Sequence, residues 1–379
     1  MNQGNPPAIF GNYILPFCIG LLLVVNSFTT LRGYSAGGPA EILLFLALFL
    51  LISYKVFSGF DLKYQALLPF LYVILFMAPI TLMNSYYEIL GSSTRTLVAL
   101  IFGAMTGFAI ANCKIIEKKS LSYGVLFILT IAVLIVLREY DFGTLQRLIF
   151  LSNNPNQIAL YSLGAMFIFS VTIERPLVLF LSLFIGTIYG YLALSDSFFL
   201  ALVIALLFAA LKFFVQIKSL LFLFIFWSIL ILIAWPLLLP NNSYIEPLIS
   251  LWSNADQGGA RVTLAINGIN AWLTSPLFGH GAGAFSGMAV EFQRFEAHNT
   301  IIDFLTMGGI PWILIIYIPI FIYMKKLLQQ GNFLALGFLL GFFIFATFHF
   351  VGRHPIFWVV WGFCMSGILH VERGKKCVE

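Results

Sequence analysis

Residues 41–57 read EILLFLALFLLISYKVF, with one acidic residue at the start and one lysine near the end. A helix needs about 20 predominantly apolar residues to cross roughly 30 Å of hydrocarbon. Apolar runs close to this length recur along the whole chain. They predict a polytopic membrane protein built as an all-α bundle of transmembrane helices.

The composition supports the same class, because 61% of the 379 residues are hydrophobic and only 9% are charged. Soluble domains carry roughly 25% charged residues. We expect residues 1–379 to form a single integral-membrane domain whose partner is the lipid bilayer, with no nucleic acid. About twelve spans are predicted, at 9–26, 41–57, 65–83, 95–112, 121–137, 157–173, 177–194, 197–214, 219–239, 298–323, 333–350 and 356–370.

Four scattered cysteines show no paired spacing and predict neither a metal site nor a disulfide framework. The first span is preceded by no basic segment and followed by no clear small-residue cleavage site, so we do not expect it to be a cleavable signal peptide.

The cations divide between the two sides when both termini are placed in the cytoplasm. All eleven lysines then lie inside and only arginines lie outside, which satisfies the positive-inside rule. A planar guanidinium suits carboxylate or phosphate oxygens, so some of the outward arginines are expected to bind an anion. The alternative is that they snorkel or pair with nearby carboxylates. The outward arginines are Arg32, Arg95, Arg138, Arg147, Arg261, Arg294 and Arg353.

The longest polar stretch, residues 240–297, is predicted to be a large, partly helical periplasmic loop that carries part of the active site. Residues 261–273 have a helical pattern, with Val262, Ile266, Ile269 and Leu273 forming an apolar stripe. Arg261 is expected in the first helical turn, where free N–H groups already favour anions. A solvated arginine at a helix start is the alternative.

A flexible turn, Gly279-His280-Gly281-Ala282-Gly283, follows this helix. It allows a close backbone approach, or it is an ordinary re-entrant turn. The tenth span then opens on Ala297-His298-Asn299, with Asp303 about one turn further on. A neutral imidazole at the mouth of a span can position or deprotonate a hydroxyl. A purely structural histidine is the alternative.

The run Gly259-Ala260-Arg261, then Ser275-Pro276-Leu277 with Gly279 and Gly281, then His298-Asn299 with Gly308-Gly309, resembles the O-antigen ligase and polymerase superfamily. The resemblance covers residues 240–325, and elsewhere only the topology is similar.

This resemblance implies a fold like that of the C-type membrane glycosyltransferases, in the bacterial inner membrane, with the active site facing the periplasm. Such enzymes move a glycan from undecaprenyl diphosphate to a sugar hydroxyl without a metal or other cofactor. By this similarity Arg261 would stabilise the diphosphate and His298 would activate the acceptor. Asn299, Asp303 and His280 are further candidates for substrate binding.

One position departs from the family, because its ligases often have a Ser-Arg pair where this chain reads Ser195-Asp196-Ser197-Phe198. A second phosphate-binding arginine would then come from Arg147, Arg138 or Arg353. This departure favours a surface-polysaccharide polymerase over a ligase that transfers the glycan to the lipid A core. A chain-length regulator protein is a further expected partner of a polymerase.

A transporter of polysaccharide or lipid-linked sugar is the alternative from another class. Against it, the sequence shows no inverted repeat and few ionisable residues at mid-depth in the spans.

Overall fold

The computed structural model describes residues 9–28, 39–59, 62–139, 152, 154–215, 255–287 and 295–369. Within these ranges the chain is mostly helical and contains no β-strand, which confirms the all-α prediction. Each predicted span in the described ranges coincides with a helix or with consecutive helical segments. The span predicted at 219–239 lies outside them, as does Arg147.

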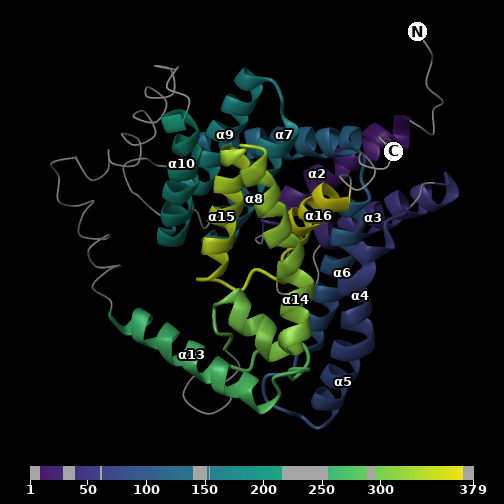
Figure 1. The fold of residues 1–379 in the computed structure, drawn as a ribbon, viewed down its shortest axis with the longest axis vertical. Coiled ribbons are helices and arrows are strands. Elements are labelled where there is room, and N and C mark those ends of the chain that lie inside the picture. Colours follow the sequence, from purple (N-terminus) through teal and green to yellow (C-terminus); the bar gives the residue numbers. More distant parts are fainter. Residues whose placement is uncertain are drawn as a thin grey trace.

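The first half of the bundle runs from the N-terminal segment to a long helix ending at Glu139. Its elements are η1 (Phe10–Ile14), α2 (Leu15–Val25), α3 (Pro39–Phe57), η3 (Tyr64–Leu67), α4 (Leu68–Tyr72), η4 (Val73–Met77), α5 (Ala78–Tyr86), α6 (Thr94–Ala111) and α7 (Ile115–Glu139). The segments from η3 to α5 follow one another as a single rod, which is also visible in Figure 1.

The second half surrounds one deeply buried helix. Its elements are α8 (Pro155–Thr172), α9 (Pro176–Tyr191), α10 (Asp196–Val215), α13 (Ala255–Thr274), α14 (Thr300–Gln329), α15 (Phe333–Ala346) and α16 (Pro355–Leu369). From Ile158 to Ser170 every residue of α8 is buried, because α7, α9, α10, α15 and α16 all pack against it. Helix α13 lies across one end of the bundle, beside α14 (Figure 1).

Five of the described helical segments are long and apolar enough to cross a membrane: Pro39–Phe57, Tyr64–Tyr86, Thr94–Ala111, Ile115–Arg138 and Thr300–Gln329. Five others are apolar but shorter, at 10–17 residues. The structure therefore supports a helical membrane protein, and the number of twelve spans stays a prediction.

Lysines of the described ranges lie at one end of the bundle, where several of them connect neighbouring helices. Lys55 of α3 pairs with Glu117 of α7 at 2.5 Å, and both side chains are buried. Lys118 of α7 donates to the hydroxyl of Ser366 in α16. Helices α6, α14 and α16 each begin at the opposite end, so the loops that precede them lie away from these lysines.

Helix α14 is interrupted in its third turn, and this break receives the glycine-rich turn. Gly309 has φ 67° and ψ −164°, a conformation open essentially only to glycine. The N–H groups of His280 and Gly281 donate to the carbonyls of Thr306 and Met307, at 2.7 and 2.9 Å. The close backbone approach expected of the glycine-rich turn is therefore made to α14 itself.

Candidate functional site

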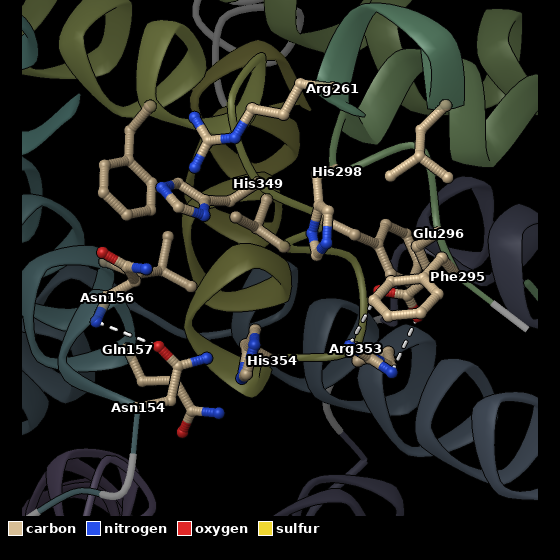
Figure 2. A pocket seen from close by; sticks show the side chains of 15 residues that line it. Asn154, Asn156, Gln157, Arg261, Phe295, Glu296, His298, His349, Arg353 and His354 are labelled. Atoms are coloured by element: carbon tan, nitrogen blue, oxygen red, sulfur yellow. Dashed lines mark hydrogen bonds and ion pairs between the residues drawn. The ribbon is translucent and has the colours of Figure 1, made fainter. Parts of the chain in front are cut away.

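A cavity of about 430 Å³ lies at the end of the bundle opposite Lys55 and Lys118. Figure 2 shows the side chains that line it. We call it the first cavity. Arg261 of α13 and His298, just before α14, line this cavity. Polar side chains of the loop between α15 and α16 and of the start of α8 complete the lining. Its polar lining consists of Asn154, Asn156, Gln157, Arg261, Glu296, His298, His349, Arg353 and His354.

Arg261 reaches the first cavity from within α13, and the expectation that it lies in the first helical turn is wrong. The helix begins at Ala255, so Arg261 is its seventh residue. Glycines occupy positions 258 and 259, but a mid-helix glycine costs only about 1 kcal/mol relative to alanine and does not by itself end a helix. The free N–H groups of the helix start lie almost two turns away, so anion binding here depends on the guanidinium.

Tight packing fixes the position of α13. A Cβ added at Gly268 would lie 2.6 Å from a methyl of Ile302 in α14, so a larger residue here would force the Ile302 side chain to shift. Leu264, one turn earlier, is buried and also lines the first cavity. The apolar stripe expected on this helix is present but faces outward. Its exposed fractions are 61% for Val262, 53% for Ile266, 42% for Ile269 and 59% for Leu273.

His298 is held by a rigid loop at the start of α14. Its φ is +52°, which is uncommon outside glycine and costs of order 1–3 kcal/mol unless the surroundings enforce it. The fully buried carboxylate of Asp303 accepts the N–H groups on either side, from Ala297 at 2.8 Å and Asn299 at 3.3 Å. The Asn299 side chain in turn accepts the N–H groups of Ile301 and Ile302 and so caps α14. These contacts position His298.

A buried threonine connects the His298 loop to the loop between α15 and α16. The Thr300 hydroxyl donates to the carbonyl of His349 at 2.6 Å and accepts the N–H of Val351 at 3.0 Å. The two histidine-bearing segments, 51 residues apart in the sequence, are thereby fixed relative to each other.

His349 forms the wall of the first cavity next to Arg261 (Figure 2). Its ring stacks on Phe345 with centroids 4.5 Å apart. Its Nε2 lies 2.8 Å from the hydroxyl of Ser197, which is 3.0 Å from that of Ser195. The hydroxyl of Ser197 therefore fixes the ring of a cavity-lining histidine.

Glu296 and Arg353 form a bidentate ion pair in the wall of the first cavity. Nη1 of Arg353 lies 2.7 Å from Oε1 of Glu296, and Nη2 lies 3.0 Å from Oε2. The charge of Arg353 is therefore largely neutralised. Arg261 has no such partner among the described carboxylate side chains, so it is the charge available to an anionic ligand.

Burial and the neighbouring arginines keep both histidines neutral. The pKa of His298 is lowered by burial and by the positive charges of Arg261 and Arg353. Burial, together with Arg261 and His298, lowers the pKa of His349 to about 3. Burial raises the pKa of Glu296, and the attraction of Arg353 acts in the opposite direction. At neutral pH the first cavity thus offers the neutral imidazoles of His298 and His349 beside the guanidinium of Arg261, which has no carboxylate partner among the described side chains.

The structure brings three of the candidate residues, Arg261, His298 and Arg353, to the first cavity. Asn299 and Asp303 are not among its lining residues and instead shape the loop that holds His298. His280 is also elsewhere, with its Nε2 2.8 Å from the carbonyl of Ala271. Arg138 is exposed in the last turn of α7.

Sequence reasoning missed the cavity-lining side chains His349 and His354, and the amides of Asn154, Asn156 and Gln157. The sequence around the two histidines contains a pattern that could have identified them. The short segment 347–354 reads TFHFVGRH and places two histidines and an arginine between two apolar runs.

No protein-family model and no curated protein matches this chain. Although three histidines line the first cavity, no group of three or more His, Cys, Asp or Glu side chains in the described ranges is arranged to hold a metal ion.

Proposed function

We propose that this chain is a membrane glycosyltransferase that moves a glycan from undecaprenyl diphosphate to an acceptor sugar hydroxyl on the periplasmic face, as a surface-polysaccharide polymerase. One observation carries the proposal. Arg261, which has no carboxylate partner among the described side chains, and the neutral His298 meet in one cavity, although the chain separates them by 37 positions.

The reaction assigns one task to each residue. The acceptor oxygen attacks the anomeric carbon of the donor glycan, and the bond from this carbon to the phosphate oxygen breaks. The leaving diphosphate takes the bonding electrons, and the guanidinium of Arg261 stabilises the charge that develops. The proton of the acceptor hydroxyl passes to His298, which is neutral and can accept it.

The surroundings of Arg261 suit a lipid-linked donor. The exposed apolar stripe of α13 faces away from the bundle, and Arg261 lies on the same helix at the first cavity. We infer that the isoprenoid chain stays in the bilayer along this stripe while its diphosphate reaches the guanidinium.

The test is turnover by the full chain in lipid nanodiscs, with an undecaprenyl-diphosphate oligosaccharide as donor and acceptor. We expect Arg261→Gln to lower kcat by roughly 10²–10³-fold, as does removal of one oxyanion donor. His298→Gln should lower it by roughly 10²–10⁴-fold. Arg175→Gln is the control, because Arg175 is exposed at the start of α9 and does not line the first cavity.

The same variants in cells separate the competing functions. A polymerase variant should leave single lipid-linked repeats on the periplasmic side and a surface glycan of core plus one repeat. Loss of all repeats from the core would indicate a ligase instead. Repeats that accumulate on the cytoplasmic side would indicate a transporter and refute the transferase.

A further inference from the structure

A second cavity, of about 640 Å³, adjoins the first. It lies between the turn that joins α5 to α6 and the residues near Ala284. Its polar side chains are Ser85, Glu88, Ser92, Ser93, Arg95 and Thr96, together with Glu296 and Arg353. Its volume falls within the roughly 300–1,000 Å³ typical of small-molecule sites.

The wall of the second cavity is held in shape by backbone contacts. The N–H of Ala284 donates to the carbonyl of Gly91 at 2.6 Å, and the N–H of Ser93 donates to that of Ala282 at 3.1 Å. Glu88 has a φ of +54°, a conformation that persists in a non-glycine residue only where the surroundings enforce it. These two backbone hydrogen bonds hold the 87–93 turn against the segment that follows α13.

The two cavities share the Glu296–Arg353 ion pair as a common wall. A ligand that fills the second cavity and extends past this pair enters the first cavity, where His298 lies two residues from Glu296. The side chain of Glu296 is only about 10% exposed and that of Arg353 is 41% exposed, so the carboxylate half of this wall is the buried one.

The two linings differ in charge. The charged side chains of the first cavity are Arg261, Arg353 and Glu296, and a net positive charge remains after the ion pair is formed. The second cavity has two carboxylates and two guanidiniums, Glu88, Glu296, Arg95 and Arg353, together with several hydroxyls. This lining is neutral overall and rich in both donors and acceptors, which suits an uncharged polyhydroxyl ligand.

We propose that the second cavity binds the sugar units of the acceptor, its oligosaccharide part, and presents the terminal hydroxyl across the Glu296–Arg353 pair to His298. Glu88 accepts hydrogen bonds from the sugar hydroxyls, and Arg95 donates to them. The inference rests on the proposed function, because it assigns the second substrate of the same reaction.

Two probes test the two cavities separately on the purified full chain in nanodiscs. The first probe is inorganic pyrophosphate. The second is an oligosaccharide of one or two repeats released by mild acid from the surface polysaccharide of the producing strain. Dissociation constants are measured by titration calorimetry, with the oligosaccharide titrated both alone and at saturating pyrophosphate.

We expect Glu88→Gln and Arg95→Gln each to weaken oligosaccharide binding by about tenfold, as for loss of a hydrogen bond to a charged group. Pyrophosphate binding should stay unchanged in both variants. Glu174→Gln and Arg175→Gln are matched controls, because both residues are exposed just before α9 and lie outside both cavities; Glu174 forms an exposed ion pair with Lys119. Arg261→Gln should show the opposite pattern, with weaker pyrophosphate binding only.

Oligosaccharide binding that is absent in both conditions, or unaffected by Glu88→Gln and Arg95→Gln, would overturn the inference. Failure of the proposed function has a different signature, since pyrophosphate binding and turnover would then be insensitive to Arg261→Gln. Correct folding of each variant is checked by its elution profile and its unfolding temperature.

Discussion

At the scale of single residues, the bound donor is expected to change the chemistry of His298. In the free protein, burial and the charges of Arg261 and Arg353 lower the pKa of His298 below its ordinary 6.5. A diphosphate in the first cavity adds negative charge beside the same imidazole, and a nearby opposite charge favours the protonated form. Donor binding should therefore raise this pKa and make His298 a stronger base when it is needed.

The prediction concerns the acid limb of the pH–rate profile. His298 must be neutral to accept a proton, so turnover is retained above its pKa and falls as the pH drops through it. The value of kcat/KM reports groups of the free enzyme, and kcat reports those of the enzyme–substrate complex. We expect the acid limb of kcat at a higher pH than that of kcat/KM. Coincident limbs, or limbs that persist unchanged in His298→Gln, would contradict this assignment.

At the scale of elements, the break in α14 makes a prediction about stability. A Cβ at Gly309 would lie 2.3 Å from the carbonyl oxygen of Leu277, and the φ of 67° is unfavourable for other residues. Gly309→Ala should therefore push Leu277 and the glycine-rich turn that follows it away from α14, and lower the unfolding temperature in detergent. Gly331→Ala is the matched control, since Gly331 has a φ of 66° and no neighbouring atom within 4 Å.

The control variant Gly331→Ala is expected to lower the free energy of unfolding by about 1–2 kcal/mol, which is the penalty of a left-handed backbone alone. Gly309→Ala should cost clearly more and should also reduce turnover, because the displaced turn connects α13 to α14 and thus Arg261 to His298. Equal unfolding temperatures for the two variants would show that the contact with Leu277 contributes nothing.

The positions of the helices were the best-predicted feature of the fold. The error at the start of α13 has a physical cause. The lengths of the apolar runs predicted the helices, because a membrane helix satisfies its backbone hydrogen bonds within its own segment. The start of α13 was predicted six residues too late, because the glycines at 258 and 259 lower helix propensity without ending the helix. The polar segment 347–354 marks His349 as a candidate, but its contact with Ser197 and the bridge through Thr300 could not be predicted, because they exist only after distant segments pack together.

At the scale of the whole molecule, the two ends of the bundle differ in their cations. Lysines such as Lys55 and Lys118 lie at one end, whereas Arg261 and Arg353 line cavities at the other. Lysine is enriched in cytoplasmic loops, so the lysine end should face the cytoplasm and both cavities should open to the periplasm. This orientation determines which pool of substrate the site can reach.

Single cysteines at the two ends test the orientation in a chain whose four native cysteines, Cys18, Cys113, Cys364 and Cys377, are replaced by alanine. Tyr87→Cys marks the cavity end, where Tyr87 is 68% exposed, and Ser58→Cys marks the lysine end at an exposed position. A membrane-impermeant maleimide added to spheroplasts should label only Tyr87→Cys, and permeabilisation should add Ser58→Cys. An unlabelled cytoplasmic protein shows that the membrane is intact. The reverse pattern would place Arg261 and His298 in the cytoplasm, where a periplasmic transferase could not use them, and would refute the proposed function as a whole.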